Sequence, residues 1–165
     1  MAWVDEGAST SAQLWSRESQ DELHHTVTCD SAVLALAVDN VRGRMLVGTQ
    51  QGDIRVWNLH TFQVQADLVG HHSSVLSLVL SDDYVFSASS DSTVRVWDAE
   101  TLQPRACVFP ASTNTGDIYS LAWDAEAQVL YFGCQDTSIE WISITPVRLQ
   151  EAACEPLWPL SLIHI

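Results

Sequence analysis

The chain has 165 residues, enough for one domain of ordinary size, and 47% of them are hydrophobic, which excludes a disordered chain. Its 7 basic and 21 acidic residues give a formal net charge of −14, a balance that repels phosphate backbones and argues against nucleic acid as a partner. The acidic surface suits basic partners, although it also serves solubility alone. No run of residues approaches the roughly 20 apolar positions of a membrane-spanning helix, so no membrane partner is expected.

The cysteines are far apart in the sequence and form no Cys-x-x-Cys motif for zinc binding or thiol exchange; they are Cys29, Cys107, Cys134 and Cys154. The first residues, 1–6, carry acidic groups where a signal peptide needs basic ones. We therefore predict reduced cysteines in a cytosolic or nuclear setting, and a cytoplasmic location is the expectation.

Residues 1–22 are rich in Ser, Gln, Asp and Glu and show no periodic pattern, so they are predicted to form a mostly disordered tail. The stretch 23–28 is predicted to form one short strand. Three units of apolar runs and turn residues follow, over about 29–69, 70–110 and 114–145. The predicted strands within these units are 33–38, 45–49, 54–57, 62–69, 75–80, 84–89, 94–97, 104–109, 118–123, 129–134 and 138–144. Short strands at regular spacing indicate an all-β chain.

One segment of the chain repeats another. Gly52–Asn58 (GDIRVWN) is matched by Ser92–Asp98 (STVRVWD), which places Trp57 and Trp97 40 residues apart. A period of ~40–45 residues that ends in a Trp-Asp-like dipeptide is typical of a four-stranded propeller blade, and such a blade must stack on neighbours to bury both of its faces. The sequence therefore predicts a partial β-propeller with three four-stranded blades over residues 23–145.

The second unit carries His71 before its first strand, Ser87 and Ser89 in its second strand, Asp91 in the next turn and Trp97 in its third strand. In these residues the chain resembles the WD-repeat propeller family, in which a His, a Ser or Thr, an Asp and a Trp form a hydrogen-bonded chain inside one blade. The resemblance implies the same role for His71, Ser87 (or Ser89), Asp91 and Trp97. In such a chain the carboxylate fixes the imidazole tautomer and the hydroxyl bridges to the indole N–H.

A His-Ser-Asp set also raises the alternative of a hydrolase. A catalytic triad needs an exposed hydroxyl and an oxyanion hole, whereas a blade buries these residues, and no Gly-x-Ser-x-Gly elbow is present. The paired imidazoles, His24-His25 and His71-His72, face opposite sides of a strand and do not chelate one ion. We therefore predict a structural role for the set, with no catalytic, cofactor-binding or metal-binding residue in this chain.

The other two units keep only parts of the set. In the first, Cys29 and Gln51 occupy the positions of His71 and Asp91. In the third, the residues near the His, Asp and Trp positions are Asn114, Asp136 and Ile142. Trp141 lies one residue early, so its side chain is predicted to face the other side of the sheet. Both units are expected to depend on packing more than on polar contacts.

A closer resemblance rests on Gly116–Leu121 and Leu130–Trp141, which are similar to the propeller portion of fungal glutathione-degrading proteins. In those proteins a WD-repeat domain precedes a zinc metallopeptidase-like domain. The resemblance covers about residues 23–145 and implies a non-catalytic scaffold segment that binds protein partners through its loops and rim. It also implies a full-length parent that is a zinc metallopeptidase-type hydrolase of glutathione (γ-glutamyl peptide) breakdown. The metal ligands of the peptidase domain have no counterpart in this chain.

The sequence leaves open a second function, and it predicts exposed blade edges. The alternative function is a general WD-repeat adaptor in signalling or complex assembly. Propellers close with ~4–8 blades, so three blades leave exposed edges that invite self-association. Residues 146–165 contain Pro146, Pro156 and Pro159, which break strands, and they have no repeat partner upstream, so this segment stays unclassified.

Overall fold

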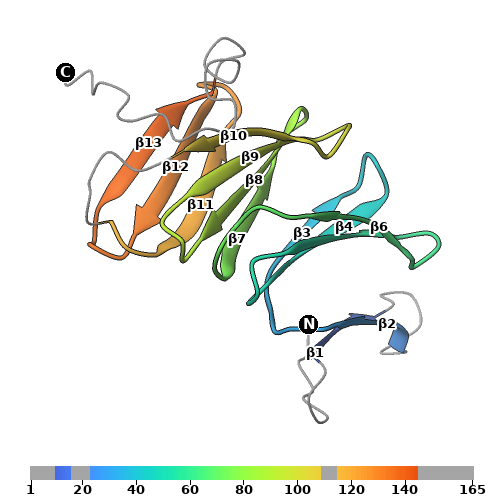
Figure 1. Cartoon of the computed structure of the whole chain (residues 1–165). Coiled ribbons are helices and arrows are strands. Elements are labelled where there is room, and N and C mark those ends of the chain that lie inside the picture. The colour runs from blue at the N-terminus through green and yellow to red at the C-terminus, as the bar shows by residue number, and fades with distance from the viewer. Residues whose placement is uncertain (1–9, 16–22, 109–114, 145–165) are drawn as a thin grey trace.

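The computed structural model describes residues 10–15, 23–108 and 115–144, and every helix-or-strand element within this part of the chain is a β-strand (Figure 1). The strands are β1 (Thr10–Trp15), β2 (Leu23–Cys29), β3 (Val33–Asp39), β4 (Arg44–Thr49), β5 (Ile54–Asn58), β6 (Val64–Leu68), β7 (Val75–Leu80), β8 (Tyr84–Ser89), β9 (Val94–Asp98), β10 (Pro104–Val108), β11 (Ile118–Asp124), β12 (Val129–Cys134) and β13 (Ile139–Ser143).

These strands form antiparallel sheets in chain order. Blade 1 is β3-β4-β5-β6, blade 2 is β7-β8-β9-β10, and blade 3 is β11-β12-β13. A further hairpin, β1-β2, precedes blade 1. Figure 1 shows the sheets side by side, with the hairpin at one end and blade 3 at the other. The chain is a partial, open β-propeller, as the sequence predicts.

The structure differs from the predictions in two places. Thr10–Trp15 form β1, so the prediction of a disordered tail is wrong for these residues; they become a strand by pairing with β2. Phe62 is predicted to begin the fourth strand of blade 1, but it has a φ of 54° and lies in the turn, so β6 begins at Val64. The fourth strand predicted for blade 3, the predicted site at Asn114 and the segment 146–165 lie outside the described residues.

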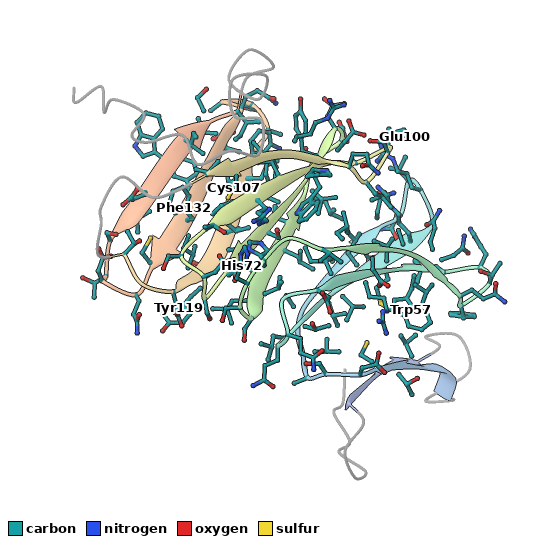
Figure 2. All side chains as sticks on the ribbon, in the orientation of Figure 1. Trp57, His72, Glu100, Cys107, Tyr119 and Phe132 are labelled. Carbon is teal, nitrogen blue, oxygen red and sulfur yellow. The ribbon has the colours of Figure 1, made fainter. Side chains whose placement is uncertain are left out.

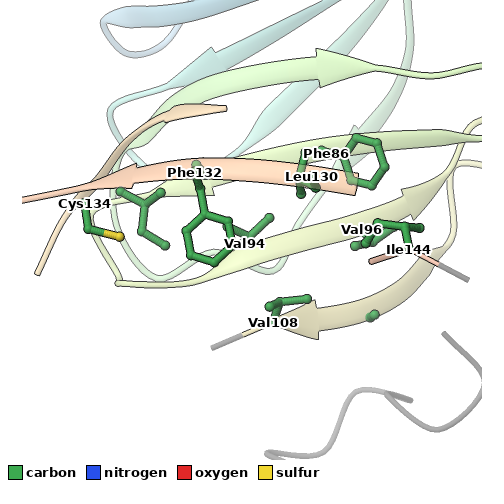
Figure 3. Close-up of a cluster of buried hydrophobic side chains, with 11 residues drawn as sticks. Phe86, Val94, Val96, Val108, Leu130, Phe132, Cys134 and Ile144 are labelled. Atoms are coloured by element: carbon green, nitrogen blue, oxygen red, sulfur yellow. The ribbon is translucent and has the colours of Figure 1, made fainter. Parts of the chain in front are cut away.

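Apolar clusters fill the space between neighbouring sheets. Between blades 1 and 2 the fully buried side chains include Leu46, Ile54, Val56, Val75 and Val85. Between blades 2 and 3 a second cluster brings together residues of both blades, several of which Figure 3 shows: Phe86, Val94, Val96, Leu130 and Phe132. A third cluster joins Val27 and Cys29 of β2 to Met45 and Val47 of blade 1. Blades 1 and 2 are therefore covered on both faces by the same kind of contact, which explains why their strands are apolar on both faces.

The Trp-Asp-like dipeptide closes the turn between the third and fourth strands. Oδ1 of Asn58 accepts hydrogen bonds from the backbone N–H groups of His60 and Thr61 at 2.8 and 3.0 Å. Oδ1 of Asp98 accepts the equivalent bonds from Glu100 and Thr101 in blade 2, at 3.0 and 2.7 Å. This is the local bonding by which Asn and Asp favour turns over strands.

Arg42, in the β3–β4 turn, and Arg44, the first residue of β4, tie blade 1 to blade 2. Arg42 donates through Nη2 to the carbonyl of Asp82 and through Nε to Glu100, both at 2.9 Å. Arg44 is buried; it donates to the carbonyl of Ala99 and pairs with Asp39 at 3.1 Å. The guanidinium groups of this β3–β4 hairpin thus satisfy carbonyl groups in the turns at one end of blade 2.

Candidate functional site

The structure brings the four residues of the predicted polar chain together in blade 2. His71 precedes β7, Ser87 lies on β8, Asp91 lies in the β8–β9 turn and Trp97 lies on β9. Nδ1 of His71 lies 2.9 Å from Oδ2 of Asp91, and Nε2 of His71 lies 2.8 Å from Oγ of Ser87. Nε1–H of Trp97 donates to the same Ser87 hydroxyl at 2.9 Å. The set therefore spans the blade from the turn to its third strand.

Of the two serines that the sequence left open, Ser87 is the bridge. Oγ of Ser89 donates to the carbonyl of Ser73 and accepts from the backbone N–H of Asp91, both at 3.0 Å. Ser89 therefore holds the two loops next to the chain and does not contact His71. Both serines lie on the same face of β8 and both are 0% exposed, so they differ in position along the strand, with Ser89 at its end beside the turn; alternation alone does not encode this difference.

Thr93 is a fifth member that sequence reasoning missed. Its Oγ1 donates to Oδ1 of Asp91 at 2.6 Å and lies 3.3 Å from Nδ1 of His71. Asp91 also accepts from the backbone N–H groups of Thr93 and His72 at 3.0 and 2.9 Å. A signal was present, because Asp136 and Ser138 repeat the Asp-x-Ser/Thr spacing in blade 3, where Ser138 Oγ donates to Asp136 at 2.5 Å.

The hydrogen bonds around Asp91 favour its ionised form. Burial raises the pKa of this carboxyl, but hydrogen bonds from His71 and Thr93 and from the His72 backbone outweigh the burial and lower the pKa well below its usual range. An ionised Asp91 holds the proton of His71 on Nδ1, so Nε2 accepts the Ser87 hydroxyl proton and Ser87 Oγ accepts from Trp97. Every polar side-chain atom of this hydrogen-bonded set then has a hydrogen-bond partner.

This arrangement does not suit nucleophilic catalysis. Ser87 is 0% exposed and Trp97 is 1% exposed, so neither substrate nor water reaches the hydroxyl. A triad serine needs an open face and nearby donors for an oxyanion, whereas the Trp97 indole covers this one. The chain of bonds is suited to fixing the loop before β7 and the β8–β9 turn.

Blade 1 has the same strand order as blade 2, but different side chains occupy the positions of the hydrogen-bonded set. Cys29 is buried at the position of His71, and burial raises the pKa of its thiol. Val47 stands in the place of Ser87, and Nε1 of Trp57 has no hydrogen-bond partner among the described residues. A cavity of about 20 Å³ lies beside the thiol, lined by Cys29, Asp30, Ser31, Thr49, Gln51, Asp53 and Arg55. Three of the lining residues, Cys29, Gln51 and Asp53, occupy the positions that His71, Asp91 and Thr93 hold in blade 2.

Blade 3 has the aspartate in the turn but lacks the other residues of the hydrogen-bonded set seen in blade 2. Asp136 accepts from Ser138, and Phe132 stands where Ser87 would be. Ile142 packs against the cluster shared with blade 2, whereas Trp141 is 62% exposed on the other face, as the sequence predicts. Among the described residues, no group of three or more His, Cys, Asp or Glu side chains is arranged to hold a metal ion, and no helix is long and apolar enough to cross a bilayer.

The comparisons with known proteins agree with the fold. Residues 62–98 match the family described as WD domain, G-beta repeat, a span that runs from the turn before β6 to the end of β9. The computationally designed proteins Ika8 and Ika4 superpose with TM-scores of 0.68 and 0.66, at 23% and 21% sequence identity, over 86% and 87% of this chain and 44% and 89% of theirs. These findings support a WD-repeat propeller.

Several curated proteins are similar over most of the chain. The Zinc finger CCCH domain-containing protein 17 of Oryza sativa subsp. japonica is 37% identical over 69% of this chain and 26% of its own length. The Probable di- and tripeptidase DUG2 of Saccharomyces cerevisiae is 29% identical over 73% of this chain and 16% of its own length. The kinesin-like protein KIF21A of Homo sapiens is 35% identical over 52% and 5%. The chain thus spans about a quarter or less of these relatives.

Proposed function

We propose that this chain is a non-catalytic scaffold that binds other proteins through the loops and the rim of its blades. WD40 repeats generally mediate protein–protein interactions, and residues 62–98 match such a repeat. The observation that carries the proposal is the burial of the His71–Ser87–Asp91 set beneath Trp97, because the residues that most resemble a catalytic site are fully engaged within the blade.

The finer proposal places the scaffold in glutathione (γ-glutamyl peptide) breakdown in the cytoplasm, within a longer protein that carries a metallopeptidase-like domain. It is supported by the similarity to a probable di- and tripeptidase of yeast, which covers 73% of this chain. In this role the propeller organises the hydrolase and its partners, and takes no part in the chemistry.

A general adaptor in signalling or complex assembly is the second candidate. Its support is that the similarity to the zinc finger protein is higher, at 37% identity, than the similarity to the peptidase, at 29%. The similar proteins also differ widely in the activities that their names state, as expected when a shared repeat serves as a binding module on different proteins.

The experiment is co-purification with the tagged chain from cells that express it, followed by assay of glutathione and dipeptide hydrolysis. We expect hydrolase activity in the bound fraction and none in the purified chain itself. Turnover by the purified chain would overturn the scaffold proposal. Bound proteins without hydrolase activity would favour the adaptor, and gene sequence beyond codon 165 that encodes a metallopeptidase-like domain would favour the peptidase parent.

Self-association through exposed blade edges is part of the same proposal. Light scattering over a range of chain concentrations measures it directly. A molar mass that rises with concentration supports the association, and a constant monomer mass contradicts it.

A further inference from the structure

The hairpin β1-β2, which lies at the end of the arc next to blade 1 in Figure 1, has the strand register of the outer half of a blade. Between the third and fourth strands of blade 1 the pairs are Ile54–Leu68, Arg55–Asp67, Val56–Ala66 and Trp57–Val64, with a register shift before the tryptophan. In the hairpin the pairs are Ala12–Val27, Gln13–Thr26, Leu14–His25 and Trp15–Leu23, with the shift at the same place. β1 and β2 therefore correspond to the third and fourth strands of a further blade, which we call blade 0.

The face of blade 1 that β2 contacts is only partly covered, as expected beside half a blade. The strand register makes Val38 of β3 equivalent to Leu80 of β7 and Trp123 of β11. Leu80 and Trp123 are partly buried against the clusters that join their blades to the preceding blade. Val38 is 49% exposed, although Val27 and Cys29 of β2 pack on the same face of blade 1.

Elsewhere in the molecule, the second strand of the preceding blade supplies the cover that Val38 lacks. The ring of Phe86 on β8 lies 5.0 Å, centroid to centroid, from the ring of Trp123. Leu46 of β4 has the position in blade 1 that Phe86 has in blade 2, and it shares a cluster with Leu80. The residue missing beside Val38 is therefore a large apolar one on the second strand of blade 0.

Another position of that second strand must be small. Two residues beyond Leu46 and Phe86 lie Gly48 and Ala88, which pair with equivalent residues of the third strand. A Cβ atom on Gly48 would lie 2.7 Å from Cγ1 of Val75 in the next blade, so a small residue is needed where the blades approach. The second strands of the three blades all carry a large apolar residue followed two positions later by a small one: Leu46-Val47-Gly48, Phe86-Ser87-Ala88 and Tyr131-Phe132-Gly133.

Residues of this sequence outside the described ranges do not supply such a strand. Residues 1–9, 16–22 and 145–165 contain no triplet of this kind. In 109–114 the triplet Phe109-Pro110-Ala111 has a proline at its centre, where a strand that pairs on both sides needs the N–H that proline lacks. The chain covers 26% of its zinc finger relative and 16% of its peptidase relative, which favours strands encoded elsewhere in a longer polypeptide.

We infer that β1 and the face of blade 1 around Val38 receive the first two strands of a WD repeat, encoded in the same polypeptide ahead of residue 1. The strand beside β1 runs antiparallel to it, with a large apolar residue opposite Leu14 and Gly or Ala opposite Ala12. Main-chain hydrogen bonds along β1 hold the added strand, and burial of Val38 beneath the large residue selects its sequence. This surface is distinct from the loops and the rim to which the proposed scaffold function refers.

The test completes blade 0 by fusion. A copy of residues 75–91, which contains β7 and β8, replaces residues 1–9 in front of Thr10, because Thr10 precedes Trp15 by the same number of residues as Ser92 precedes Trp97. The control fusion carries Phe86→Glu in the copy. We expect the first fusion to have a higher urea midpoint than the control and an unfolding equilibrium constant lower by about tenfold or more, as burial of one phenylalanine implies.

The substitution Val38→Asp reports directly on the cover of blade 1. In the chain without the fusion Val38 is half-exposed, so the substitution should change the unfolding equilibrium constant by about twofold or less. In the first fusion the change should be about tenfold, because the carboxylate would be buried without a partner. Val41→Asp is the matched control, since Val41 is 87% exposed in the β3–β4 turn and the substitution should have an equally small effect in both proteins.

Equal urea midpoints for the two fusions would overturn the inference, and so would an effect of Val38→Asp that is the same with and without the fusion. Upstream codons that lack the large-x-small triplet would overturn the assignment to the same polypeptide. Binding of a free peptide of residues 75–91 to the full chain would in that case assign the strands to a separate WD-repeat protein. None of these failures touches the scaffold proposal, because co-purification of partners with the tagged chain tests it separately.

Discussion

Blades 1 and 2 have the same strand order and the same register at the equivalent positions, yet their interiors differ in polarity. Blade 2 buries a complete chain of hydrogen bonds from Asp91 to Trp97, whereas blade 1 has Cys29 and Val47 in the places of the imidazole and the hydroxyl. Both sheets form. The apolar contacts between neighbouring sheets therefore establish the blade, and the polar chain adds stability and fixes the adjoining loops.

The comparison also shows what happens when the polar chain is lost. In blade 1 the indole of Trp57, labelled in Figure 2, packs toward the cluster shared with β2, and its Nε1 has no partner among the described residues. Oγ1 of Thr49 is likewise buried without a hydrogen-bond partner among the described residues, and Thr49 lines the cavity beside Cys29. Blade 1 thus leaves unsatisfied an indole and a hydroxyl whose equivalents in blade 2, Trp97 and Ser89, are hydrogen-bonded; in the described part of blade 2 the buried unsatisfied atom is Nε of Arg95.

The largest effect is expected from removing the indole of blade 2. Trp97→Ala leaves a cavity in the cluster between blades 1 and 2 and should cost about 3–5 kcal/mol of unfolding free energy. The matched variant Trp57→Ala should cost less, because Trp57 is only partly buried. Urea unfolding followed by circular dichroism measures both, and equal losses would contradict the contrast between the blades.

Removing the imidazole of blade 2 should have the next largest effect. His71→Ala leaves Ser87 and Asp91 without their partner and should cost about 1–3 kcal/mol. His72→Ala is the control, because its side chain is exposed and only its backbone N–H contacts Asp91; it should change stability by less than about 0.5 kcal/mol. The idea is contradicted if the two variants unfold at the same urea concentration.

Acid should weaken blade 2 through Asp91. Hydrogen bonds hold the pKa of this carboxyl below its usual value, so its contribution to stability is present above about pH 4 and is lost as the pH falls through the lowered value of the folded state. Asp91→Asn should unfold more easily near neutral pH and show a smaller further loss in acid than the unchanged chain. Urea midpoints at about pH 5 and pH 3 test this, and parallel losses would refute it.

The smallest effect is expected from supplying blade 1 with the missing hydroxyl. Val47→Ser offers an acceptor to Trp57 Nε1, worth about 1 kcal/mol, but it removes a buried apolar side chain worth about 1.5–3 kcal/mol. The net change should be a loss of about 1 kcal/mol. The reciprocal Ser87→Val should cost more, because it orphans both His71 and Trp97; a smaller cost for Ser87→Val would reverse the interpretation.

The repeat around Trp57 and Trp97 predicted the blades well because hydrophobic alternation and turn residues are local signals. β1 was missed because it forms by pairing with β2, a contact that no local pattern encodes. A weak local signal existed, since Ser11, Ala12, Gln13 and Leu14 alternate polar and apolar residues, but the run is short. The choice between Ser87 and Ser89 required the three-dimensional register, because both lie on the same face of one strand.

The β3–β4 hairpin that carries Arg42 and Arg44 affects how the sheets separate on unfolding. Separating blades 1 and 2 would break the hydrogen bonds that Arg42 donates to Asp82 and Glu100 and that buried Arg44 donates to Ala99, and it would expose the apolar cluster behind them. These two sheets should therefore open as one cooperative unit in amide hydrogen exchange, and blade 3 should exchange by a separate, lower-energy opening. The arc is then a rigid pair of sheets with a more easily detached third.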